Sequence, residues 1–126
     1  MQLIVDGMNV IGSRPDGWWR DRPAAQRALV RTIEAAGATR LGGACTVVFD
    51  GRPVDLDDGE VEVCFAPGGP NAADDVIAAL VEASDEPGQL MVVTSDTALA
   101  ARVRAAGAQV EAATAFRRRL GEDHRR

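Results

Sequence analysis

The chain contains no lysine, and its one histidine, His124, lies in the charged C-terminal end. All 14 basic residues are therefore arginines. Catalysis by lysine is excluded, and we assign His124 no role. Response-regulator receiver domains also gather acidic residues at strand ends, but they need a lysine near the last strands. The missing lysine argues against that class.

Cysteines and long apolar runs are also scarce. Cys45 and Cys64 lie in separate apolar runs without the spacing of a metal motif, so we expect both to be small buried residues. No apolar run approaches the roughly 18 residues that a membrane-spanning helix needs. The first residues lack the basic region and long apolar stretch of a signal peptide. We therefore expect a cytoplasmic protein with no membrane partner.

The phosphate-binding loops of several enzyme classes are absent. Neither G-x-x-x-x-G-K-[ST] nor G-x-G-x-x-G occurs, which argues against binding of nucleoside triphosphates or dinucleotides. Haloacid-dehalogenase-like phosphatases carry D-x-D on the first strand, whereas Asp6 is followed by Gly7 and Met8. These phosphate-handling designs fit the chain less well.

What is present is the composition of one soluble domain, with 126 residues, 46% hydrophobic and 26% charged. We assign residues 1–120 to this domain and residues 121–126 to a short charged tail. The net charge of −5 argues against strong binding of nucleic acid, yet arginines cluster near residues 14–31 and 117–126, where they could hold phosphates. Alternatively, these arginines are solvated surface residues in a genome that avoids lysine.

Short apolar runs alternate with helical patterns along the chain. We expect strands at residues 3–5, 44–49, 61–65, 90–93 and 108–110. The third strand alternates apolar and polar residues, which indicates an edge strand with one wetter face. Alternation of strands with helical segments predicts a central, mostly parallel sheet in a three-layer α/β/α fold.

Residues 7–22 resemble a long connection because glycines and prolines interrupt them. This stretch carries Trp18 and Trp19 between Arg14 and Arg20. Aromatic and arginine side chains together suit stacking on bases and contact with phosphates. The alternative is that the tryptophan pair anchors the loop on the core.

Three helices are predicted from end signals and apolar spacing, and the last covers residues 97–106 before a stop at Gly107. Asp21 and Pro23 begin the first, which Gly37 should stop. Asn71 should cap the second, which continues to about Ala83.

The second helix presents one apolar face and two adjacent acids. Its apolar face consists of Ala73, Val76, Ile77, Leu80 and Val81. Asp74 lies at the border of this face and Asp75 almost opposite, so Asp74 is better placed to reach a site at the sheet edge. Alternatively, both acids only complement the helix dipole.

Asp6, Asp50 and Asp96 each follow an apolar run. The carboxyl ends of parallel strands form the ligand-binding edge of such folds, so these acids should meet there, joined by Asp74. Like charges repel, and a divalent cation would relieve the repulsion. Oxygen ligands select Mg²⁺ or Mn²⁺, which can activate water for phosphodiester cleavage. Asp96 could instead only cap the helix that follows.

Four short motifs occur in the order of a known family: V-D-G-M-N at 5–9, V-V-F-D at 47–50, N-A-A-D-D at 71–75, and T-S-D at 94–96 followed by A-G-A. Over residues 3–120 the sequence resembles the YacP-like branch of the NYN domains, which are PIN-like ribonucleases. The resemblance implies a PIN-like fold, metal-dependent RNA cleavage, and a metal centre on three acids, Asp6, Asp74 and Asp96. It also implies a polar role for Asn9 and supporting roles for Asp50 and Asp75.

The leading hypothesis is a Mg²⁺- or Mn²⁺-dependent endoribonuclease with Asp6, Asp74, Asp96 and Asn9 as catalytic residues. The expected RNA-binding residues are Arg14, Trp18, Trp19, Arg20, Arg52, Arg117 and Arg118. One alternative is a non-catalytic RNA-binding or adaptor domain, and another is a metal-dependent phosphatase. A ribosome or a protein partner could deliver the RNA.

Overall fold

The structure, a computed structural model, describes residues 1–69 and 71–121. Its centre is a five-stranded sheet in the order β3-β2-β1-β4-β5, and every neighbouring pair is parallel. The strands are β1 (Gln2–Asp6), β2 (Cys45–Asp50), β3 (Glu62–Ala66), β4 (Leu90–Val93) and β5 (Gln109–Glu111). The predicted α/β fold is confirmed, and so is the edge position of β3.

The apolar run at residues 3–5 forms the middle of the sheet. Val5 of β1 lies between Val47 of β2 and Val93 of β4. A strand with neighbours on both edges and helices on both faces has no solvated side, which explains why its residues are apolar without alternation. The chain therefore leaves this strand at the centre of the carboxyl edge.

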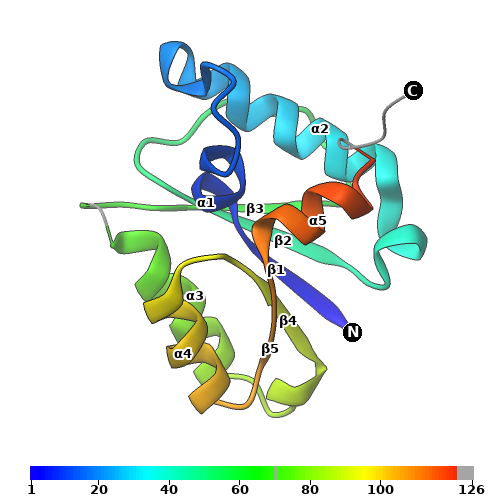
Figure 1. The fold of residues 1–126 in the computed structure, drawn as a ribbon, viewed down its shortest axis with the longest axis vertical. Helices are drawn as coiled ribbons and strands as arrows, with labels where there is room; N and C mark the ends of the chain where they lie inside the picture. Colours follow the sequence, from blue (N-terminus) through cyan, green and yellow to red (C-terminus); the bar gives the residue numbers. More distant parts are fainter. Residues whose placement is uncertain (70, 122–126) are drawn as a thin grey trace.

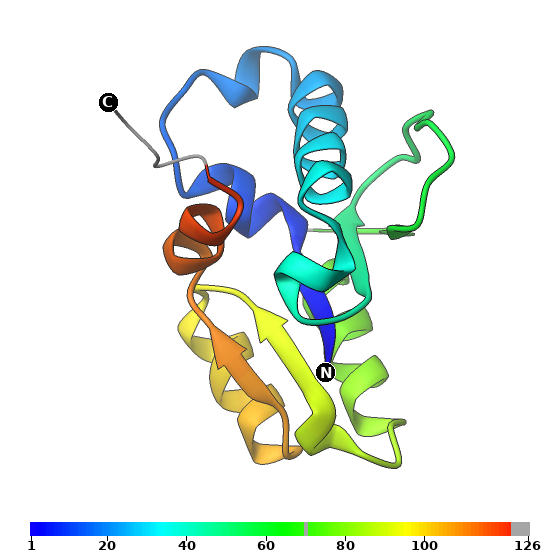
Figure 2. The same ribbon diagram turned by 90° about the vertical axis from the view of Figure 1, so that its right-hand side faces the viewer.

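Helices cover both faces of the sheet (Figures 1 and 2). One face carries α1 (Gly7–Gly12), α2 (Arg22–Leu41) and α5 (Ala113–Arg119), and the other carries α3 (Ala72–Glu82) and α4 (Thr97–Ala105). Short 3₁₀ helices, η1 (Trp18–Arg20) and η2 (Pro87–Gln89), precede α2 and β4. Side chains of successive residues in β1 point to opposite faces of the sheet. Leu3 and Val5 pack in the core under α2, while Ile4 packs in the core under α3.

The expectation of a long loop after Asp6 is wrong at its start, where α1 forms. Val10 and Ile11 of α1 are buried in the core. Gly7 lets the helix approach β2 closely, because a Cβ atom there would lie 2.4 Å from Cε1 of Phe49. Tertiary packing thus stabilises a six-residue helix that its own glycines disfavour.

The first predicted helix is confirmed at its start, and Gly37 ends its regular part as expected. Asp21 caps α2 by accepting a hydrogen bond from the Ala24 N–H at 3.1 Å. Gly37, with φ 76° and ψ 159°, is non-helical, and a second helical stretch follows it to Leu41, with Gly42, at φ 87°, as the C-cap residue. Gly37 therefore ends the first helical stretch, and what the sequence did not predict is the short second stretch beyond the kink.

The buried face of α3 is rotated from the predicted one. Leu80 is 42% exposed, whereas Ala78 is buried. The rotation brings Asp74 from the border of the apolar face into the side that packs on the sheet. Asn71 occupies the N-cap position, but its side chain makes no capping hydrogen bond.

The remaining expectations concern cysteines, membranes and the tail. Cys45 is buried, which raises the pKa of its thiol to about 12, and Cys64 is half-buried. Both are free cysteines. Within residues 1–69 and 71–121, no helix is long and apolar enough to cross a bilayer. The predicted tail, including His124, lies outside the described residues except for Gly121.

Candidate functional site

Asp6 ends β1 and immediately precedes α1, so its carboxylate lies where the two central strands finish. The residue is 5% exposed. Its Oδ2 accepts a hydrogen bond of 2.9 Å from the hydroxyl of Thr94, which follows β4. The fold therefore buries an acidic side chain at the carboxyl edge and orients it from the neighbouring strand.

The segment after β4 is tied to the end of β1 by two side chains. The Thr94 hydroxyl, besides donating to Asp6, accepts a hydrogen bond from the Asp96 N–H at 3.1 Å. Asn9 of α1 accepts a hydrogen bond through Oδ1 from the Ser95 N–H at 2.8 Å. These contacts fix Asp6, Asn9 and Asp96 relative to one another.

Asp74 and Asp75 share the first turn of α3 but have different surroundings. The exposed Asp75 accepts a hydrogen bond through Oδ1 from Arg102 of α4 at 2.9 Å. Asp74 is half-buried, and its charge acts on both Asp6 and Asp96. The structure therefore brings Asp74 to the site and turns Asp75 toward α4.

Asp96 and Asp50 have defined partners of their own. Asp96 caps α4, because its Oδ1 accepts a hydrogen bond from the Leu99 N–H at 3.0 Å. Because this hydrogen bond uses Oδ1, Oδ2 of Asp96 can still accept another hydrogen bond or bind a cation. Asp50, at the end of β2, forms an ion pair with Arg22 of α2, which also donates to the Asp50 carbonyl at 2.8 Å.

Burial and mutual repulsion act on the ionisation of this acidic edge, by which we mean Asp6, Asp50, Asp74 and Asp96. Burial is the largest cause that raises the pKa of Asp6 to about 6, and the other three carboxylates raise it further while the Thr94 hydroxyl lowers it. The pKa of Asp74 is also raised, first by burial and then by Asp96. Ionisation of Asp6 and Asp74 is therefore less favourable in the folded protein than in water.

The donor atoms of the edge fit a hard divalent cation. Asp6, Asp74 and Asp96 offer only oxygen, and a nearby positive charge would lower the raised pKa values. Within the described part of the chain, no three or more His, Cys, Asp or Glu side chains are arranged as a ready metal site. Cation binding would require the three side chains to converge.

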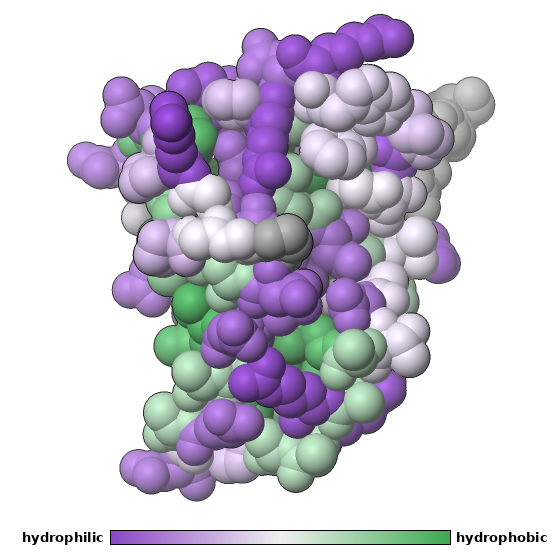
Figure 3. Space-filling view, turned by 90° about the vertical axis from the view of Figure 1, so that its left-hand side faces the viewer, coloured by the Kyte–Doolittle hydropathy of each residue, from purple (hydrophilic) through white to green (hydrophobic). Residues whose placement is uncertain are grey.

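Figure 3 shows the side of the molecule toward which β3 and the start of α3 point in Figure 1. Hydrophilic side chains occupy the middle and much of the upper part of this face, with hydrophobic ones exposed beside and below them.

The predicted RNA-binding residues divide into exposed and partly buried ones. Trp18 is half-buried against the core, and Arg14 is half-buried and ion-paired with Asp16 at 3.5 Å. The exposed members are Trp19, Arg20, Arg52 and Arg118. Arg52 lies two residues beyond the end of β2, close in sequence to the acidic edge.

Arg117 does not fit the expectation of RNA contact, because it is 6% exposed. Its Nε donates to the Val10 carbonyl at 3.0 Å and to the Ser13 hydroxyl at 2.9 Å, and its Nη2 donates to the Ile11 carbonyl at 3.3 Å. Arginine here satisfies the last carbonyls of α1. The structure therefore assigns Arg117 to packing of α5 on α1, which sequence spacing alone did not reveal.

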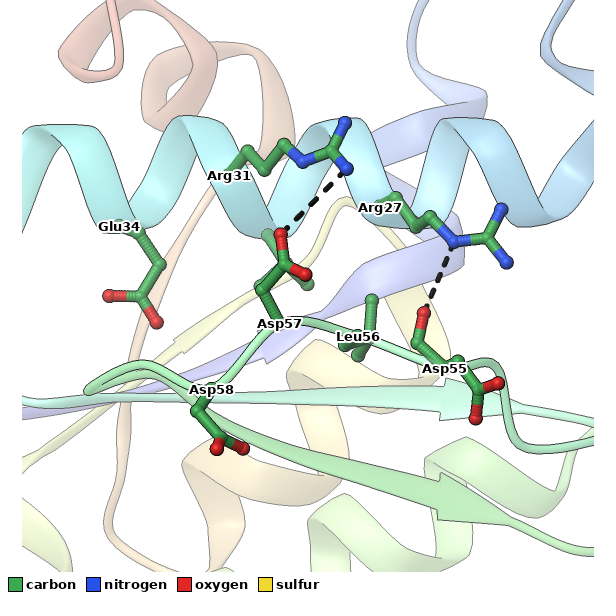
Figure 4. Close-up of a pocket in the computed structure, with 8 residues that line it drawn as sticks. Arg27, Arg31, Glu34, Asp55, Leu56, Asp57 and Asp58 are labelled. Atoms are coloured by element: carbon green, nitrogen blue, oxygen red, sulfur yellow. Dashed lines mark hydrogen bonds and ion pairs between the residues drawn. The ribbon is translucent and has the colours of Figure 1, made fainter.

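A hollow lined by several acids lies elsewhere, between α2 and the connection from β2 to β3 (Figure 4). It measures about 300 Å³. Arg27 Nε donates to the Asp55 carbonyl at 3.1 Å, and Arg31 faces Asp57 at 3.9 Å. None of the residues that line it belongs to the acidic edge.

Sequence reasoning missed the roles of Thr94, Arg22 and Arg102. Thr94 directly follows an apolar strand and precedes a predicted site residue, a position that could have marked it. Arg22 and Arg102 are paired with acids distant in sequence. Such pairs have no local signal and need the fold.

Comparison with known proteins gives one family. The model of the YacP-like NYN domain matches residues 3–126. Among solved structures, Rae1 (YacP) from Bacillus subtilis is similar, with a TM-score of 0.75 and 27% identity, covering 97% of this chain and 74% of that chain. Its W164L mutant gives 0.76 and 28%, covering 96% and 75%.

Curated relatives carry less specific names. A UPF0178 protein of Xanthomonas oryzae pv. oryzae is 41% identical over 95 residues, which are 75% of this chain and 55% of that protein. A UPF0178 protein of Xanthomonas campestris pv. campestris is 40% identical over 90 residues, or 71% and 52%. The chain thus spans about half the length of these relatives.

Proposed function

Because the chain belongs to the YacP-like NYN domain family, we propose that it is a metal-dependent endoribonuclease that hydrolyses RNA phosphodiester bonds at the acidic edge. The family is one of PIN-like nucleases, which supports an RNase-type function and an RNA substrate. The observation that carries the proposal is that three separate segments place Asp6, Asp74 and Asp96 at the same edge of the sheet, where burial and repulsion between the carboxylates raise the pKa values of Asp6 and Asp74.

The proposed metal ligands are Asp6, Asp74 and Asp96. When bound, Mg²⁺ or Mn²⁺ supplies activation of water and neutralisation of charge at the phosphodiester. Asp50 and Asp75 have a supporting role in this proposal, because each already accepts an arginine. Below pH of about 6, a proton on Asp6 would compete with the cation.

The other side chains orient the site. Thr94 donates to Asp6 and so holds its carboxylate in place. Asn9 uses Oδ1 for the Ser95 N–H, which directs its amide NH₂ group to donate elsewhere, for example to a phosphate oxygen or to water. Exposed arginines such as Arg20 and Arg52 would hold the RNA backbone.

Cleavage of end-labelled single-stranded RNA with Mn²⁺ tests the proposal. We expect Asp6→Asn and EDTA each to abolish cleavage. Asp57→Asn, which changes an exposed acid outside the edge, should leave the rate unchanged. Robust cleavage by Asp6→Asn in EDTA would refute a metal site at Asp6.

The same assay separates the alternatives. RNA binding without cleavage under any divalent cation would instead support an adaptor domain. Turnover of a simple phosphomonoester in place of RNA would support a phosphatase. A cytoplasmic location and delivery of RNA by a ribosome or protein partner stay predictions.

A further inference from the structure

We propose that Trp19 is a stacking platform for an unpaired RNA base beside the acidic edge. The inference rests on the proposed function in that RNA is the ligand. Trp19 is 57% exposed, and within the described residues the other exposed large hydrophobic side chains are Met1 and Leu80. An exposed tryptophan offers a large flat surface to any base, since every base has a π-face.

The backbone around Trp19 is ordered by a 3₁₀ turn and by packing of the adjacent Trp18. Gly17, with φ 84°, turns the chain into η1, and its carbonyl accepts a hydrogen bond from the Arg20 N–H at 3.0 Å. Trp18 packs against the core and meets Trp19 edge-on, with ring centroids 5.9 Å apart at 86°. Asp21 then caps α2. A ring fixed before binding loses little entropy when a base stacks on it.

Arg20 adds a positive charge to the platform. Its guanidinium carbon lies 6.0 Å from the centroid of the Trp19 ring, a cation–π distance. The exposed Arg20 could therefore contact the phosphate of a nucleotide whose base stacks on Trp19. An aromatic ring and an arginine at adjacent positions supply both interactions that single-stranded nucleic acid needs.

The platform adjoins the acidic edge through Arg22. Arg22 pairs with Asp50 at the end of β2, and the charge of Asp50 raises the pKa of Asp6. Arg20 precedes Arg22 by two residues, which span at most about 7 Å. Trp19 itself lies three residues before the arginine that contacts the edge at Asp50.

The charge balance favours stacking over phosphate contacts as the source of affinity. The chain has a net charge of −5, and the acidic edge repels phosphates. Several arginines are already paired with acids of the protein, including Arg22, Arg31, Arg102 and Arg119. Stacking on Trp19 is not opposed by these charges and is weakly sensitive to salt.

Tryptophan fluorescence of the full chain in EDTA tests the inference without cleavage. An unstructured eight-nucleotide RNA should quench the fluorescence, and a fully paired hairpin of similar length should not. Trp19→Ala should weaken binding of the single strand about fivefold or more and remove the quenching, since one stacked base contributes about 1–3 kcal/mol. Leu80→Ala, which removes another exposed apolar side chain, should bind as the wild type does.

Salt dependence provides a second measurement. We expect the logarithm of the single-strand affinity to fall with the logarithm of salt with a slope shallower than about −2, corresponding to fewer than three phosphate contacts. Equal affinity of Trp19→Ala and wild type for the single strand would overturn the inference. Equal quenching by the hairpin would also overturn it.

The outcome is separable from that of the proposed function. If the single strand binds through Trp19 but no cation supports cleavage, the platform stands and the ribonuclease proposal fails. If Mn²⁺-dependent cleavage occurs with unchanged KM in Trp19→Ala, the ribonuclease proposal stands and the platform fails.

Discussion

The acidic edge and the connection from β2 to β3 that lies against α2, called the loop below, both contain several carboxylates, but the surroundings of the two groups differ. In the loop, Asp57 faces Arg31 at 3.9 Å, and its side chain is 86% exposed (Figure 4). Arg27 holds the same loop through the Asp55 carbonyl. At the edge, Asp6 is 5% exposed and faces other acids. Solvent and arginine compensate the loop carboxylates, whereas burial and repulsion raise the energy of the Asp6 carboxylate.

The difference separates an acidic surface from a candidate site. Exposed acids near arginines need no explanation beyond solubility and weak pairing. A buried carboxylate whose pKa is raised by neighbours of the same sign costs stability, and such groups cluster at functional sites. The electrostatic state of the acids therefore distinguishes the two regions.

Substitution of a glycine in each region should produce the largest contrast. At Gly7 a Cβ atom would lie 2.4 Å from the buried Phe49 ring, so Gly7→Ala should destabilise the fold by roughly 3 kcal/mol. At Gly59 a Cβ atom would meet the flexible Glu34 carboxylate, so Gly59→Ala should cost about 1 kcal/mol. Urea denaturation measures the free energy of unfolding of both variants. Equal decreases would show that the Phe49 ring moves aside to accommodate the added methyl group.

The pH dependence of stability should distinguish Asp6 from Asp57. Folding raises the pKa of Asp6 from 3.8 to about 6, so without metal its contribution is most favourable below pH 4 and is lost as pH rises through 6. Asp6→Asn removes this penalty. In EDTA the variant should gain about 3 kcal/mol relative to wild type at pH 8 and less than about 1 kcal/mol at pH 4.

Thermal unfolding across this pH range provides the measurement. Asp57→Asn should show no comparable pH-dependent gain, because that side chain is exposed. A gain for Asp6→Asn that does not change between pH 4 and 8 would argue against a raised pKa.

Replacement of Thr94 tests how the edge is oriented. Thr94→Val keeps the shape but removes the hydroxyl that donates to Asp6 and accepts from the Asp96 N–H. We expect a loss of about 1–2 kcal/mol in chemical denaturation and a further rise in the pKa of Asp6. Thr94→Ser should restore most of both, and a full loss in Thr94→Ser would indicate that the methyl group matters more than the hydroxyl.

Removal of an arginine from the loop should have the smallest effect. Arg31→Gln breaks an exposed ion pair with Asp57, so the unfolding free energy should change by less than about 0.5 kcal/mol. Cleavage of RNA should be unaffected. Denaturation and the cleavage rate measure these two quantities. A large decrease in the unfolding free energy or in the cleavage rate would show that the loop contributes to stability or to activity.

The sequence predicted most of the sheet and the position of three acids, because both depend on local patterns. Apolar runs identified the strands, and the rule that parallel strands share a carboxyl edge brought Asp6 and Asp96 together. Helix phase correctly favoured Asp74 over Asp75 as the more buried acid, although Leu80 was assigned to the wrong face.

Other features depend on contacts between distant segments. Helix α1 forms because Gly7 packs under Phe49 and because α5 supplies Arg117 to its last carbonyls. Neither partner is visible in the local sequence of α1. The same holds for Thr94 and Asp6, which are 88 positions apart.

The central claim is that the acidic edge, and not the loop, binds a divalent cation. Titration of the metal-free protein with Mn²⁺, followed by thermal unfolding, tests it most directly. At a free concentration of 100 times Kd, Mn²⁺ should stabilise the wild type and Asp57→Asn by about 2.7 kcal/mol, and Asp6→Asn and Asp74→Asn by much less. Equal stabilisation of all four proteins, or none of the wild type, would contradict the claim.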